Sequence, residues 1–214
     1  VCITHSTGGP VIRAWLHHFY ISAGKKTSPL SHLIMLAPAN FGSALVKLGL
    51  SKLSRLKAWF EGVDVGTGVL DWLELGSPQS LALNLEWLAN GAACIGPKGV
   101  FPFVLTGESH DPHLYDHVNS YTAEMGSDGV MRVAAANLNY THVQLTQQAP
   151  AADKKAKLGF SAPVLKPGAP KLSPSVPMAV IPGVFHSDVR IAIIRSIAAD
   201  DKPHPSRTGI LQCR

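Results

Sequence analysis

The sequence predicts an α/β fold in which helices flank a mostly parallel β-sheet. Two short apolar segments of strand-forming residues, 1–4 and 32–36, enclose a segment whose apolar residues recur at helical spacing. Strand, helix and strand in this order build parallel sheets. The composition, 46% apolar and 15% charged residues over 214 positions, indicates a globular chain with one core. We therefore expect a single domain over residues 1–214.

The first three elements follow from local signals. The strand at 1–4 runs directly into a turn of small residues, and helical spacing of apolar residues begins at Val11. Pro10 suits the first turn of this helix, and Gly24 is a suitable stop. The segment 32–36 has the length and composition of a buried parallel strand.

Residues 42–95 predict short amphipathic helices, because leucines and three of the four tryptophans alternate with lysine, arginine and other polar residues. Two interpretations remain open. The helices either pack on the sheet, or they form a lid- or cap-like insertion over an apolar pocket.

The second half of the chain predicts the remaining strands and a last helix. The expected order is a strand at 101–106, a polar loop at 107–129, a strand at 142–146, a connector rich in Pro, Lys and Ala at 149–177, a strand at 178–181 and a helix at 188–198.

The turn after the first strand is a candidate nucleophile site. In Thr4-His5-Ser6-Thr7-Gly8-Gly9 a strand ends at a serine that is followed by small residues. A serine on a sharp, strained strand-to-helix turn exposes its hydroxyl to a substrate. Ser6 is therefore the candidate nucleophile.

This motif resembles the nucleophile elbow, G-x-S-x-G, of the α/β-hydrolase superfamily, and within it the bacterial lipases and esterases. Gly8 matches the pattern, whereas Thr4 stands where glycine is usual. Segments 126–130 and 181–187 are similar to the acid loop and the histidine loop of these enzymes, and they follow in the family's order of Ser, Asp and His. Segments 36–43 and 76–84 resemble further lipase stretches, P-x-x-G-S and G-S…L-N.

The resemblance implies a carboxylic ester hydrolase, of lipase or esterase type, that acts on lipids or small acyl esters. Its triad would be Ser6, Asp128 and His186, with an acyl-enzyme intermediate and no cofactor. The backbone N–H of Thr7 would be one oxyanion donor. We expect three aromatic residues to contact the acyl chain: Phe41, Trp72 and Trp87.

Alternatives accompany these assignments. Asp128 is also a typical turn residue, with Glu108, Asp111 and Asp116 as competing acids, and His186 is also suited to cap the following helix. The second functional hypothesis is a catalytically weak or inactive hydrolase-like fragment that serves as a binding or assembly module. Thr4 in the elbow and the lack of a second oxyanion donor favour this alternative.

The position of Ser6 near residue 1 adds an expectation. Members of the superfamily have several strands before the nucleophile, and the second oxyanion donor comes from a loop there. We therefore expect a sheet that lacks these N-terminal strands and leaves the edge of its first strand open. The candidates to cover this edge are a partner chain, a segment of the connector at 149–177 or a second copy of the chain, and we expect self-association into a homo-oligomer.

Charge and cysteine content disfavour other classes. The net charge is +5, but the basic residues are dispersed, as at Lys154, Lys155 and Lys157, without interleaved aromatics. This pattern does not indicate a nucleic-acid partner, and it is compatible with peripheral contact to an anionic lipid surface. Three scattered cysteines form neither a disulfide framework nor a zinc motif.

A histidine cluster is the weak candidate for a metal site. His110, His113 and His117 lie close together with two aspartates, which suits a structural ion, although a polar surface loop is the simpler interpretation. No apolar run reaches the length of a bilayer span. Localisation, bacterial cytoplasmic or secreted, is not determined by these residues.

Overall fold

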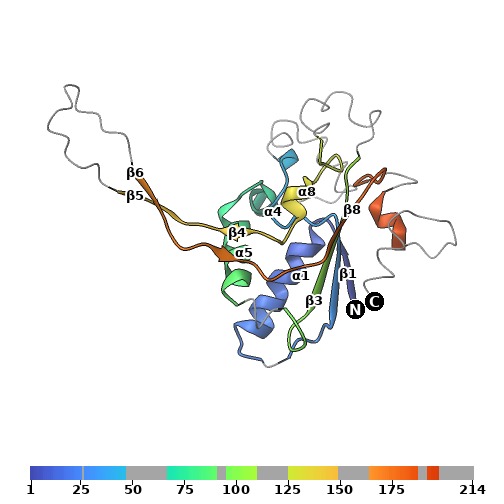
Figure 1. Ribbon diagram of the computed structural model, residues 1–214. Helices are drawn as coiled ribbons and strands as arrows, with labels where there is room; N and C mark the ends of the chain where they lie inside the picture. Colours follow the sequence, from blue (N-terminus) through green and yellow to red (C-terminus); the bar gives the residue numbers. More distant parts are fainter. Residues whose placement is uncertain are drawn as a thin grey trace, which may run out of the picture.

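The computed structural model describes residues 1–25, 27–46, 67–90, 95–109, 125–148, 164–187 and 192–197. Its centre is a four-stranded sheet in the order β1-β2-β3-β8 (Figure 1). The strands are β1 (Cys2–His5), β2 (His32–Leu36), β3 (Phe101–Gly107) and β8 (Met178–Ile181). All three pairings are parallel, which confirms the predicted mostly parallel sheet. Within the described part of the chain, β1 is an edge strand of this sheet.

Helix α1 (Gly8–Leu16) follows β1 and continues as a π-helix, η1 (His17–Ile21). It begins at Gly8, so Pro10 lies in its first turn as predicted. Gly24 ends this segment with a positive φ of 65°, as expected for a helix stop without a Cβ.

Three further helices follow: α4 (Thr67–Leu73), α5 (Pro78–Ala89) and the short α8 (Val133–Ala136). Helix α4 contacts α5, α5 contacts α1, and α8 contacts β3. Ser77 caps α5, since its side chain accepts a hydrogen bond from the N–H of Ser80, and Pro78 occupies the first turn. At the C-terminal side, the predicted helix over 188–198 is a 3₁₀-helix, η2 (Ile193–Ile197), within the described residues.

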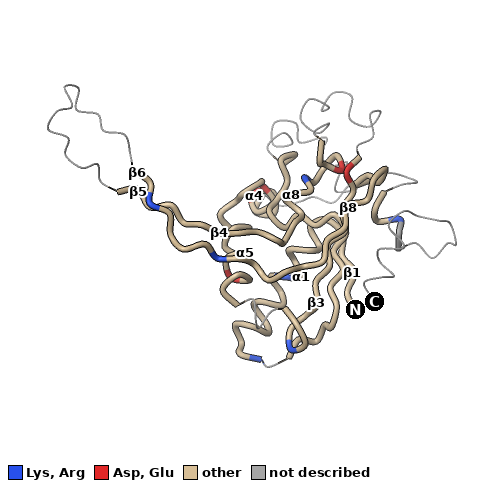
Figure 2. Tube along the Cα trace, viewed as in Figure 1, with Lys and Arg blue, Asp and Glu red and all other residues tan. Residues whose placement is uncertain are grey.

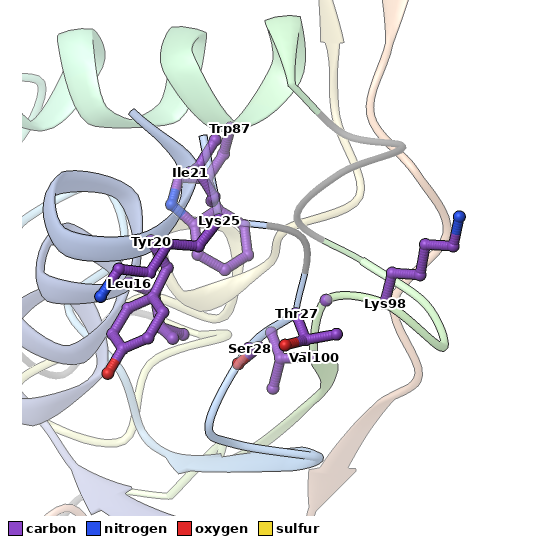
Figure 3. Close-up of a pocket in the computed structure, with 10 residues that line it drawn as sticks. Leu16, Tyr20, Ile21, Lys25, Thr27, Ser28, Trp87, Lys98 and Val100 are labelled. Carbon is purple, nitrogen blue, oxygen red and sulfur yellow. The ribbon is translucent and has the colours of Figure 1, made fainter. Parts of the chain in front are cut away.

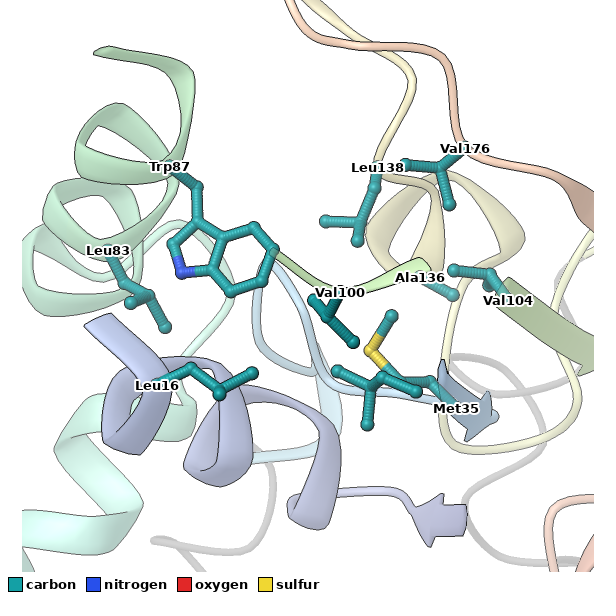
Figure 4. Packing of buried hydrophobic residues seen from close by; sticks show 10 residues of the cluster. Leu16, Met35, Leu83, Trp87, Val100, Val104, Ala136, Leu138 and Val176 are labelled. Atoms are coloured by element: carbon teal, nitrogen blue, oxygen red, sulfur yellow. The ribbon is translucent and has the colours of Figure 1, made fainter. Parts of the chain in front are cut away.

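The main core lies between α1, α5 and the sheet. Leu83 and Trp87 of α5 point toward Leu16 of α1 and toward Met35 of β2 (Figure 4). These four side chains are at most 6% exposed. Helix α5 is therefore packed in the core, whereas residues 47–66 and 91–94 of the predicted insertion lie outside the described residues.

A pair of antiparallel ribbons corrects the prediction for the region after α8. Strand β4 (Thr141–His142) pairs with β7 (Lys171–Leu172), and β5 (Leu145–Gln148) pairs with β6 (Val164–Pro167). The single strand expected at 142–146 is thus two short strands, and residues 164–167 and 171–172 of the expected connector form strands. The prolines and lysines of this segment obscure the apolar pattern typical of a strand. Both residue types are tolerated in a two-stranded ribbon, because each of its strands is an edge strand.

No helix of the described residues is long and apolar enough to cross a membrane.

Candidate active site

Three candidate residues follow the carboxyl ends of parallel strands. Ser6 comes directly after β1, Asp128 comes after β3 in sequence, and His186 lies five residues after β8. Because the carboxyl ends of parallel strands share one edge of a sheet, loops from different strands meet there.

Ser6 occupies a strained turn. Its φ is 53°, a left-handed conformation that is uncommon for a residue with a side chain and costs about 1–3 kcal/mol. Backbone hydrogen bonds hold it, since its N–H donates to Leu36 at 2.9 Å and its carbonyl accepts from Ala39 at 3.2 Å. The Ser6 hydroxyl is buried and has no hydrogen-bond partner among the described residues.

Thr4 is accommodated in this elbow by Gly8. A Cβ placed on Gly8 would lie 3.1 Å from Cβ of Thr4, which is tighter than an ordinary contact. The glycine present in the pattern therefore provides the room that the unusual threonine requires.

Asp128 and His186 form a buried pair. Nδ1 of His186 lies 2.9 Å from Oδ2 of Asp128, and the two side chains are 1% and 0% exposed. The other carboxylate oxygen accepts backbone N–H groups of Val130 at 3.0 Å and Met131 at 2.6 Å. Since a carboxylate only accepts hydrogen bonds, Nδ1 of His186 is the donor in this contact, and the tautomer that fits it leaves Nε2 as the acceptor nitrogen of the ring.

Of the competing acids, Glu108 is exposed beyond the end of β3, and Asp111 and Asp116 lie outside the described residues. Asp128 is also the turn former that its sequence context predicts, because its carboxylate accepts two N–H groups of its own loop. One carboxylate thus orders its own turn and contacts the histidine.

His5, beside Ser6, packs its ring against the ring of His186. The ring centroids are 4.7 Å apart at an interplanar angle of 39°. Burial, with a smaller contribution from the nearby His186, lowers the pKa of His5 to about 4, although Asp128 acts in the opposite direction. His5 is therefore neutral near pH 7. Nε2 of His5 is buried without a hydrogen-bond partner among the described residues.

The lowered pKa of His5 predicts a loss of stability in mild acid. The unfolded chain takes up a proton on this histidine near its ordinary pKa of 6.5, whereas the folded chain does so only near 4. The contribution of His5 to the free energy of unfolding is therefore complete above pH 6.5, and it is lost as the pH falls toward 4. From about pH 7 to about pH 5 the free energy of unfolding should fall by about 2 kcal/mol from this group.

Urea unfolding of wild type and His5→Asn at the two pH values measures this effect. The wild type should lose about 2 kcal/mol more than the variant. The exposed His18→Asn variant is the control for removing one histidine. Parallel pH dependences of wild type and His5→Asn would contradict the assignment.

The other candidate residues lie at different places. Thr7 is the N-cap residue of α1, with φ −57° and ψ −25°, so its amide belongs to the helix N-terminus. The ring of Phe41 packs edge-on against Tyr140 at 5.2 Å. Trp72 is half-buried beside two of the core clusters. Trp87 is in the core under the guanidinium of Arg13, 4.7 Å from it.

The histidine cluster at 110, 113 and 117 lies outside the described residues. Within the described ranges, no group of three or more His, Cys, Asp or Glu side chains could hold a metal ion.

A buried polar network that we did not predict supports the loop beside Ser6. Arg13 of α1 is 1% exposed and donates to the side-chain oxygens of Asn40 at 3.1 Å and Asn84 at 2.9 Å. Asn84 in turn donates to the backbone oxygen of Asn40 at 2.8 Å. Asn40 follows Ala39, whose N–H holds the carbonyl of Ser6. Asn40 lies in segment 36–43 and Asn84 in segment 76–84, the two stretches that resemble lipase motifs. That resemblance was the sequence signal for this network.

Gly107 at the end of β3 is a second residue that the sequence did not reveal. A Cβ there would overlap the carbonyl oxygen of Val184 and lie 3.3 Å from Cβ of Asp128. The end of β3 therefore approaches the loop before His186 as closely as a backbone without a side chain permits.

A small cavity lies at the opposite, amino-terminal edge of the sheet. It measures about 20 Å³ and is lined by Tyr20, Trp87 and Val100, while the side chain of Lys98 points away from it (Figure 3). It has room for roughly one water molecule. We do not consider it a substrate pocket.

Comparison with known proteins gives structural relatives. No family model and no curated protein sequence matches this chain. The structure matches that of phospholipase PlaB from Legionella pneumophila with a TM-score of 0.78, and the two sequences are 47% identical over a match that covers 99% of this chain. The same phospholipase in complex with thio-NAD is 43% identical over 99% of the chain, with a TM-score of 0.77. This chain spans 42% and 41% of those proteins.

Proposed function

The chain has the α/β-hydrolase-like fold of the bacterial lipases, and we propose from this that it is a carboxylic ester hydrolase whose substrates are lipid acyl esters. The observation that carries the proposal is the buried hydrogen bond between Asp128 and His186, in loops that follow the same sheet edge as the strained Ser6. The 47% identity to a phospholipase over nearly the whole chain supports lipid esters as the substrate class. Phospholipids are accordingly our first candidates.

In the proposed mechanism Ser6 attacks the acyl carbonyl carbon. Nε2 of His186 takes the hydroxyl proton as the bond forms, and then gives it to the departing alcohol as the ester bond breaks. The acyl group remains on Ser6 until water, activated by the same nitrogen, releases the fatty acid and restores the hydroxyl. Asp128 holds His186 in the tautomer that leaves Nε2 basic, and it stabilises the imidazolium.

The negative charge on the carbonyl oxygen requires N–H donors. In the proposal, the N–H of Thr7 supplies one, at the positive end of α1. One such donor contributes about 3 kcal/mol of transition-state stabilisation. Phe41 and Trp72 are the proposed acyl contacts; we do not include Trp87, because it is 3% exposed in the core.

Two wider expectations stay part of the proposal. The segment 42–95 would contribute an acyl pocket or lid, and a second copy of the chain would cover the edge of β1 that no described strand pairs with. Neither is required for the chemistry at Ser6.

Covalent labelling tests the proposed function. A fluorophosphonate probe should react with the folded chain, and peptide mass spectrometry should find the adduct on Ser6, because only an assembled triad activates a serine. Urea-unfolded chain is the control and should remain unlabelled. Folded chain that is not labelled, or is labelled elsewhere, would contradict the proposal and favour the inactive binding or assembly module.

The chain-length preference is measured in parallel. Rates on p-nitrophenyl butyrate, p-nitrophenyl palmitate and phosphatidylglycerol separate an esterase from a lipase and a phospholipase.

A further inference from the structure

The two ribbons β4–β7 and β5–β6 form an arm that projects from the sheet and its helices (Figure 1). We define the arm as residues 141–148 and 164–173. Every residue of β5 and β6 is exposed. A two-stranded ribbon with both faces in water is at best marginally stable. The arm therefore has a surface that a partner would stabilise.

Large apolar side chains of the arm are turned to solvent. Leu145 is 58% exposed, Val164 and Leu165 are each 55% exposed, Leu172 is 72% exposed and Val143 is 41% exposed. Five such residues on so short an arm are more than the single exposed apolar side chains of an ordinary surface.

The register of β5 and β6 places the two leucines on one face and the lysine on the other. Cross-strand partners lie on one face of a ribbon, and successive residues alternate between faces. Leu145 pairs with Pro167, and Leu165 pairs with Gln147, so both leucines lie on the same face. Lys166 pairs with Thr146 on the other face, which Val164 shares. One face of the ribbon therefore carries both leucines and no charged side chain.

The charges of the arm have one sign. Lys166 and Lys171 are exposed, and residues 141–148 and 164–173 contain no Asp or Glu. In Figure 2 the charged position on β6 is accordingly blue. Two copies of the arm packed on each other would bring these lysines together without an acidic partner on the arm. An anionic partner is complementary to it.

From these observations we propose that the arm docks on the surface of an anionic phospholipid bilayer. Leu145 and Leu165 enter the boundary of the acyl chains, and Lys166 and Lys171 contact phosphate headgroups, as lysines do on the polar face of an interfacial amphipathic helix. This inference rests on the proposed function in one respect: docking brings the chain to its lipid substrate.

Vesicle flotation tests the docking. The chain is mixed with phosphatidylcholine vesicles, with and without one quarter phosphatidylglycerol, and bound and free protein are separated. Wild type should float with the anionic vesicles only. Leu145→Ser with Leu165→Ser should reduce binding at least about tenfold. Lys166→Gln with Lys171→Gln should reduce it about 25-fold, since each lysine contributes about fivefold.

The matched control carries Val69→Ser and Lys98→Gln, which change an exposed apolar and an exposed basic residue outside the arm. It should bind as wild type does. Equal binding by wild type and the arm variants, or no binding by wild type, would overturn the proposal. So would a loss of self-association in the arm variants by sedimentation velocity, because the arm would then be a protein contact.

Hydrolysis of soluble p-nitrophenyl butyrate keeps the two proposals apart. The arm variants should hydrolyse it at the wild-type rate. If neither wild type nor the arm variants hydrolyse it while vesicle binding depends on the arm, the proposed function fails and the docking stands. If wild type and variants all hydrolyse it and none of them binds vesicles, only the docking fails.

Discussion

Ser6→Ala should reduce kcat/KM for p-nitrophenyl butyrate by at least about a thousandfold. The alanine removes the oxygen that forms the acyl-enzyme, and no other group of the proposed site replaces it. Binding and the Thr7 donor would leave a residual rate above that of the uncatalysed reaction. The expected effect is therefore mainly on kcat.

The stability of Ser6→Ala should change little, because the lost hydroxyl has no hydrogen-bond partner among the described residues. Thermal unfolding beside the kinetics checks this. Ser31→Ala, which removes an exposed hydroxyl at the opposite end of β2, is the matched control and should retain wild-type rates. Equal rates of wild type and Ser6→Ala would refute the serine mechanism.

Gly107→Ala should destabilise the chain by about 3 kcal/mol or more and reduce kcat/KM about a hundredfold. The new methyl would overlap the carbonyl oxygen of Val184 and lie 2.8 Å from its carbonyl carbon. Both neighbours are backbone, so relief requires the end of β3 to separate from the loop that precedes His186. Val184 is fully buried in a cluster with Leu105, which makes such a movement costly.

Urea unfolding and the kinetics of surviving folded protein measure both effects of Gly107→Ala. Gly68→Ala is the matched control, because no atom lies within 4 Å of a Cβ built there and the residue is in α4. It should be neutral or slightly stabilising, as alanine favours a helix. A Gly107→Ala chain as stable and active as Gly68→Ala would contradict the close approach.

The central sheet was predictable because each of its strands has a local signal. Apolar segments of strand length ended by turn residues identified β2, β3 and β8 to within about a residue. The ribbon strands β6 and β7 have no such signal, since all six residues are exposed and two are lysines. Their pairing depends on residues 16 to 31 positions away.

Motif order named Ser6, Asp128 and His186 as candidates, and the structure brings Asp128 and His186 into contact. Motif order says nothing about the surroundings of these residues. The ring contact of His5, the support of Asn40 by Arg13 and the close approach at Gly107 are all contacts between distant segments, so only the folded chain reveals them.

By itself, then, the sequence determined the α/β class and named the candidate residues of the proposed ester hydrolysis, because periodicity, turn chemistry and motifs act over a few neighbouring positions. The tertiary structure decided which acid contacts the histidine. Asp128 and His186 are 58 positions apart in the chain, and they meet at 2.9 Å only because β3 and β8 are adjacent parallel strands. That adjacency is a property of how the strands pair, and no local pattern encodes it.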